Sequence, residues 1–168
     1  MIKEMIHMLS GLLEKSECAE CRLCCAFDNY DIWETPVFTP ELTEKILQLI
    51  PGISLVKRGN CYSFRIPELK GDELFVCPLL DSSSGCILGD EKPFECRIWP
   101  FRIMKLNSRR VIAVASICEP VNSKPLRDIA AFLKNGLAGQ IFAYADRYPE
   151  IIKEYDSTYP ILLFEKTF

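Results

Sequence analysis

Four cysteines lie within eight residues near the amino end of the chain, in the segment CAECRLCC at residues 18–25. A cysteine thiolate is both a nucleophile and a soft metal ligand. Thiols at this density favour cross-linking, redox chemistry or metal binding over packing alone. Five more cysteines follow along the chain: Cys61, Cys77, Cys86, Cys96 and Cys118. Sulfur chemistry is therefore the first function to consider.

The amino-terminal segment, residues 1–15, does not have the form of a secretory signal. Glu4 interrupts its apolar residues, and no small-residue cleavage site follows. The sequence therefore predicts a cytoplasmic protein, whose thiols the cell keeps reduced. Nine cysteines in that compartment indicate metal binding rather than a disulfide framework. The longest apolar runs, such as residues 111–115, are far shorter than the roughly 20 residues of a bilayer-spanning helix, so no membrane association is expected.

The spacing of the first cysteines suits a metal site. Cysteines two residues apart in a tight turn can bind one metal together, and four sulfurs around a metal are typical of zinc or an iron–sulfur cluster. Cys18, Cys21 and Cys24 also match the start of a bacterial ferredoxin motif, but Cys25 follows Cys24 at once. Adjacent side chains usually point apart. The pair is therefore expected either to serve two metals or to bridge one compact multinuclear site.

The composition excludes several classes of function. The single histidine, His7, is expected to be a surface or half-buried residue, and one histidine cannot build the sites that need two or three. A net charge of -3 lacks the basic surface of a general nucleic-acid binder. Arg22, Arg97 and Arg102 lie within or beside the cysteine motifs. They either offset the charge of metal-bound thiolates or are ordinary surface arginines.

The elements that would position the cysteines are helices and short strands. Apolar residues three and four apart predict a helix over residues 2–15, and Thr39-Pro40-Glu41 predicts a helix start, with Leu42, Ile46, Leu49 and Ile50 buried and an end at Pro51-Gly52. Strands are expected at residues 53–58, 61–66, 73–76, 96–106, 109–117 and 161–164, with irregular structure at residues 27–38 and turns at residues 79–93. A helical region is expected over about residues 123–148, where Gly136 and Gly139 are the candidate breaks.

The predicted fold class is α+β: a small single domain with short antiparallel strands, flanking helices and a cysteine-rich metal-binding core. A length of 168 residues fits one domain over residues 1–168. With 49% hydrophobic and 26% charged residues, the chain has the composition of a folded globular protein.

Four segments in order resemble a known family. They are residues 18–25 (CAECRLCC), residues 77–81 (CPLLD), Cys86 and residues 92–101 (KPFECRIWPF). Together they resemble the cysteine-cluster family named for its CxxCxxCC motif, a zinc- or iron-chelating domain with eight shared cysteines. The likeness covers about residues 18–118. This chain departs from it at Gly89, where an aromatic residue is usual, and at Lys92, where arginine is usual.

The resemblance implies a metal-ligand role for eight residues: Cys18, Cys21, Cys24, Cys25, Cys77, Cys86, Cys96 and Cys118. Cys61 is outside the pattern, and we expect it to be a small buried hydrophobic residue. Lysine at position 92 cannot reproduce the bidentate fork of the arginine that is usual in the family. Any contact that the family's arginine makes would therefore be weaker in this chain.

The functional expectation is a metal-binding protein that holds zinc or an iron–sulfur cluster as an accessory or redox protein. A structural zinc module is the alternative. Some longer proteins that resemble the family are lysine N-methylases of flagellin, but this chain has no Gly-x-Gly-x-x-Gly loop and no other catalytic motif. The expected partners are metal ions. A protein partner stays open, because Trp33, Trp99 and Phe101 either dock one or belong to the core.

Overall fold

A four-stranded sheet carries the main core of the protein. In the computed structural model, which describes residues 8–166, β8 (Phe101–Leu106) and β9 (Arg109–Val114) form an antiparallel pair. Antiparallel β11 (Ile161–Phe164) adds to β9, and parallel β10 (Lys153–Glu154) adds to β8, so the order is β10-β8-β9-β11. The strand expected at residues 161–164 is confirmed, and the one expected at residues 109–117 is present but ends at Val114.

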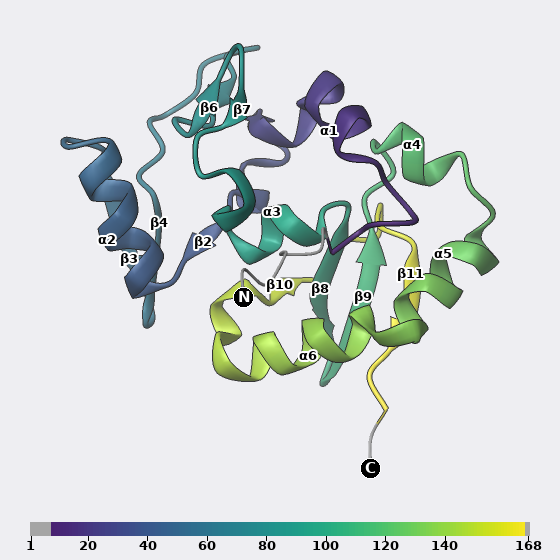
Figure 1. The fold of residues 1–168 in the computed structure, drawn as a ribbon. Helices are drawn as coiled ribbons and strands as arrows, with labels where there is room; N and C mark the ends of the chain where they lie inside the picture. The colour runs from purple at the N-terminus through teal and green to yellow at the C-terminus, as the bar shows by residue number, and fades with distance from the viewer. Residues whose placement is uncertain (1–7, 167–168) are drawn as a thin grey trace, which may run out of the picture.

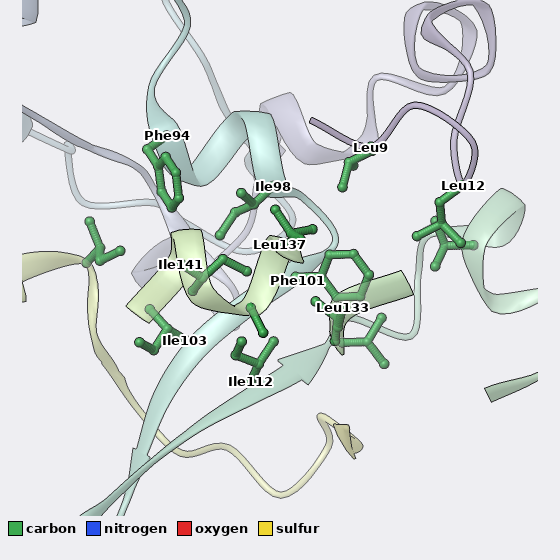
Figure 2. Packing of buried hydrophobic residues seen from close by; sticks show 14 of the residues in the cluster. Leu9, Leu12, Phe94, Ile98, Phe101, Ile103, Ile112, Leu133, Leu137 and Ile141 are labelled. Atoms are coloured by element: carbon green, nitrogen blue, oxygen red, sulfur yellow. The ribbon is translucent and has the colours of Figure 1, made fainter. Parts of the chain in front are cut away.

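Helices pack on one face of this sheet. They are α5 (Leu126–Phe132), the π-helical turn η4 (Leu133–Leu137) and α6 (Ala138–Arg147), preceded by α4 (Glu119–Asn122). Figure 2 shows Ile103 and Ile112 of the sheet close to Leu137 and Ile141 of the helices, and all four belong to one buried cluster. The predicted helical region is confirmed, and the break falls at Gly136, whose φ of +123° suits glycine.

The other face of the sheet is covered as well. Met104, Val111 and Ala113 are buried there, with Trp33 and Tyr159 packed against them. Successive strand residues point to opposite faces. A strand that is covered on both faces therefore reads as a continuous apolar run, as residues 111–115 do.

A smaller unit contains β2 (Val37–Phe38), β4 (Cys61–Phe64) and β3 (Leu55–Arg58), with β4 in the centre of the three-stranded sheet. It lies beside α2 (Pro40–Leu49), away from α6 and β9 (Figure 1). The predicted cap is confirmed, because the Thr39 hydroxyl accepts the Leu42 N–H at 3.3 Å. The predicted buried face is wrong at Leu49, which is 49% exposed.

The helix expected over residues 2–15 is wrong in its described part, and residues 1–7, with His7, lie outside the described residues. Residues 8–13 form turns, and Gly11 has a φ of +90°, which a helix does not tolerate. The helix α1 (Lys15–Cys21) begins later, where the Glu17 carboxylate accepts the Glu14 N–H at 2.9 Å. The apolar spacing instead reflects core packing, since Leu9 and Leu12 are buried.

Two other predictions need correction. Residues 96–98, expected in a strand, belong to the helix α3 (Phe94–Ile98), and strand structure begins only at Phe101. The turn-rich segment of residues 79–93 contains a hairpin of β6 (Leu80–Asp81) and β7 (Gly85–Cys86), followed by the 3-10 turn η3 (Gly89–Glu91).

The combination of helices with mostly antiparallel strands makes this an α+β fold, as predicted. The segment of residues 27–38 is mostly irregular, as expected, with the short turn η2 (Ile32–Glu34). A second short turn, η5 (Pro149–Ile151), follows α6. None of the helices described between residues 8 and 166 has the length and apolar character needed to cross a membrane.

Candidate metal centre

The predicted ligands come from six separate places in the fold. Cys18 and Cys21 are on α1, Cys24 and Cys25 on the 3-10 turn η1 (Leu23–Cys25), Cys77 directly after β5 (Phe75–Val76), Cys86 at the end of β7, Cys96 on α3 and Cys118 directly before α4. Figure 1 shows α1 between the β6–β7 hairpin and α4, with α3 below it. All of these elements lie at the same end of the molecule.

A sharp change of direction after α1 separates the first cysteines from the next two. Arg22 has a φ of +52°, in the left-handed region, and its N–H bonds to the Cys18 carbonyl at 3.4 Å. The chain then passes through η1 into β1 (Ala26–Phe27), which pairs with β5. The Cys77 N–H donates to the Cys25 carbonyl at 2.8 Å. Two cysteines far apart in sequence are thereby held next to each other.

The β6–β7 hairpin brings a further cysteine to this place. The Asp81 carboxylate accepts hydrogen bonds from the backbone and hydroxyl groups of Ser83 and Ser84, at 2.5–2.9 Å. These bonds, the Ser83 hydroxyl first, hold the pKa of Asp81 below its usual range. This closed turn places Cys86 opposite Leu80 in the hairpin. Leu80 follows Cys77 by three residues in the chain.

The cysteines line two pockets that share part of their walls. The larger cavity has a volume of about 240 Å³ and is lined by six of them: Cys18, Cys24, Cys25, Cys77, Cys86 and Cys96. The smaller pocket, of about 20 Å³, is lined by four: Cys18, Cys21, Cys24 and Cys118. Every cysteine with a predicted ligand role thus lines at least one pocket. Cys61 lines neither and is 1% exposed in β4, which confirms the burial expected for it.

The thiols do not form a finished coordination sphere. All nine cysteines are free, with no disulfide among them. Within residues 8–166, no three histidine, cysteine, aspartate or glutamate side chains converge closely enough to hold a metal ion as they stand. The structure therefore brings the eight thiols to the walls of two pockets.

Burial opposes ionisation of most of these thiols. It raises the pKa of Cys77 to about 12 and also raises the pKa of Cys96, Cys18, Cys86 and Cys118. A metal bound by these thiols would have to replace their protons, so its uptake would release protons and be favoured by higher pH.

Cys25 is the exception among the buried thiols. A hydrogen bond from the Cys24 thiol lowers the pKa of Cys25 to about 7, and the charges of Lys92 and Arg22 act in the same direction. The same bond raises the pKa of Cys24, which keeps its proton. The adjacent pair therefore contains one thiol that ionises readily and one that does not.

Alkylation should reveal this difference. Because the pKa of Cys25 is lowered to about 7 and that of Cys77 is raised to about 12, we expect Cys25 of the reduced, metal-free protein to react with iodoacetamide at pH 7 more than about ten-fold faster than Cys77. Peptide mass spectrometry after short exposures measures both rates. The chain unfolded in urea is the control, because there the two thiols should react alike. Equal rates in the folded protein would show that the Cys24 bond and the nearby cations do not activate Cys25.

Cationic side chains line the larger cavity together with the sulfurs. Lys92 is one of them, and its charge lowers the pKa of Cys18, Cys25 and Cys86 against the effect of burial. Lys15 also lines the cavity and pairs with Asp90 at 2.9 Å. Lysine at position 92 thus supplies a charge near the sulfurs without the fork of an arginine.

Sequence reasoning missed a buried charge network behind α3. The Arg102 guanidinium lies 3.2 Å from the Glu34 carboxylate and 3.5 Å from that of Glu95, and Lys153 lies 3.4 Å from Glu95. Glu95 also accepts the Val37 N–H at 2.7 Å. Glu95 directly precedes Cys96, so this network fixes the helix that carries one of the thiols. The signal in the sequence was a charged residue, Arg102, among the apolar residues at the start of β8.

The arginines and aromatic residues near the motifs have different roles. Arg102 is buried, 4.8 Å from the Trp99 ring centre, so it is not a surface residue. Arg22 donates to the Ser82 carbonyl at 2.5 Å and lines the larger cavity. Trp99 and Phe101 are 6% and 0% exposed, which places them in the core rather than on a docking surface.

The function of this protein is inferred from the geometry and chemistry of the two pockets, and the resemblance to the cysteine-cluster family stays an expectation from the sequence. No family model matches this chain, and no curated protein or solved structure matches it either.

Proposed function

We propose that this protein binds metal through cysteine thiolates, holding zinc or an iron–sulfur cluster, and acts as an accessory or redox protein. The observation that supports this most is the meeting of eight cysteines, from six places in the fold, around two pockets with a common wall. Packing alone gives no reason to gather so many thiols. Soft thiolate sets select zinc and iron–sulfur clusters among the metals of the cell.

The electrostatics of the site are compatible with this proposal. Metal-bound cysteines are deprotonated, so a four-sulfur site carries net negative charge. Lys92 and Arg22 at the larger cavity offset part of that charge, as the lowered pKa of Cys25 indicates. An all-cysteine shell leaves no open coordination position, which favours holding a metal over hydrolysis at it.

A structural zinc module is the second candidate, and one observation favours it. The segments that carry Cys25, Cys77 and Cys86 are joined by short strand pairings: β1 with β5 and β6 with β7 contain two residue pairs each. A metal would add cross-links where the backbone supplies few. In this case the metal would serve the fold and nothing else.

Metal analysis tests the proposal. The full chain, purified without oxygen after growth with both zinc and iron, should contain at least one metal per chain, and Cys25→Ser should lose much of it. Cys61→Ser is the matched control, since Cys61 lines neither pocket and should keep the parent content. Zinc, iron and acid-labile sulfide are measured together with the visible spectrum before and after dithionite. Less than one metal per chain in the parent would contradict the proposal, and zinc alone would exclude electron transfer.

A further inference from the structure

The eight thiols do not surround their two pockets evenly. Four line the larger cavity only: Cys25, Cys77, Cys86 and Cys96. Cys21 and Cys118 line the smaller pocket only. Cys18 and Cys24 form the wall between the two. Two complete sets of four sulfurs are available if the wall residues belong to the smaller pocket.

Most of the electrostatic interactions among the thiols follow the same division. Cys77, Cys86 and Cys96 each interact with Cys25, and Cys77 also interacts with Cys86 and Cys96. On the other side, Cys118 interacts with Cys18 and Cys21, which also interact with each other. Such interactions are effective only over short distances. The interactions that cross the division are those of Cys24 with Cys25 and Cys96 and that of Cys18 with Cys25, and all of them involve the two wall residues. Cys25 is at the centre of the larger set.

The two pockets differ in size by an order of magnitude. A space of roughly 10–15 Å³ on this measure holds one water molecule. The smaller pocket, at about 20 Å³, fits a guest of a single atom. The larger cavity, at about 240 Å³, fits a polyatomic guest, and its lysines suit an anionic one. Zinc needs only the centre of a sulfur tetrahedron, whereas an iron–sulfur cluster contains several irons and bridging sulfides.

We infer that the protein holds two different metal groups: an iron–sulfur cluster on Cys25, Cys77, Cys86 and Cys96, and a single zinc ion on Cys18, Cys21, Cys24 and Cys118. This inference rests on the proposed metal-binding function and goes further by assigning each sulfur to a guest. The adjacent Cys24 and Cys25 then belong to different sites, and α1 with its turn at Arg22 is the divider between them.

Selective substitution tests the division. We would grow cells with zinc and iron both supplied, purify the full chain without oxygen, and measure zinc, iron and sulfide per chain. The parent should contain about one zinc together with iron and sulfide in equal amounts. Cys21→Ser should lose the zinc and keep the iron, the sulfide and the visible absorption. Cys86→Ser should lose the iron, the sulfide and the visible absorption and keep the zinc. Cys61→Ser should keep everything.

The outcomes separate this inference from the function on which it rests. Parallel loss of both metals in Cys21→Ser and Cys86→Ser would overturn the division and leave metal binding intact. Zinc alone, or iron alone, in the parent would also overturn it. A parent without metal would overturn both. Cys21 is exposed, so its substitution does not disturb the core, and circular dichroism of each variant identifies loss of folding. The buried Cys118→Ser should repeat the zinc loss of Cys21→Ser.

Discussion

Replacing Arg102 by methionine is expected to lower the free energy of unfolding by about 3–5 kcal/mol. The guanidinium is 6% exposed and lies between the Glu34 and Glu95 carboxylates, whose side chains are 4% and 3% exposed. Burial already raises the pKa of Glu34, and Arg102 counteracts that shift. Without the arginine, only Lys153 remains from this network to offset two buried carboxylates. Urea unfolding of the parent and the variant, in the same metal state, measures the difference.

An exposed arginine provides the control for this substitution. Arg127→Met removes the same kind of side chain from α5, where it is 86% exposed beside Asp128. Exposed pairs of this kind contribute about 0–1 kcal/mol, so this variant should unfold close to the parent. If Arg102→Met is no less stable than Arg127→Met, the network behind α3 does not stabilise the fold.

If the protein binds metal as proposed, removing it is expected to loosen the cysteine end of the molecule and leave the main sheet intact. A ligand present at about 100 times its dissociation constant stabilises the folded state by about 2.7 kcal/mol, or roughly a hundred-fold in hydrogen exchange. The amides that should lose protection after chelation are those of Cys77, bonded to the Cys25 carbonyl, and Ile87, bonded to the Leu79 carbonyl. Each belongs to a pairing of few residues.

The amides between β8 and β9 are the internal reference for this measurement. Six residue pairs join these strands, and buried side chains cover both faces. Their protection should change by less than about two-fold, because opening there requires loss of the core. Equal loss of protection at both ends would instead favour the structural zinc module, since the metal would then stabilise the whole fold.

Local signals in the sequence predicted the elements that are determined by residues close together in the chain. Thr39 and Pro40 mark the start of α2 because a capping hydroxyl and a first-turn proline act within one turn. The helix prediction for residues 2–15 failed where it could be compared, because apolar residues at helical spacing also occur in buried turns. Gly11, which has a positive φ in the structure, was the local signal against a helix.

The sequence by itself determined which residues can do chemistry. The nine cysteines, their spacing and the position of Cys61 outside the cysteine motifs can all be read from it without a structure. Only the tertiary structure decided how they group. Cys24 and Cys25 are neighbours in the chain and both line the larger cavity, but only Cys24 also lines the smaller pocket, whereas Cys25 and Cys77 are joined by a backbone hydrogen bond. The buried contact of Arg102 with Glu95 was equally invisible in sequence. The reason is physical, because pockets and charge networks form between segments that only the packed core brings together.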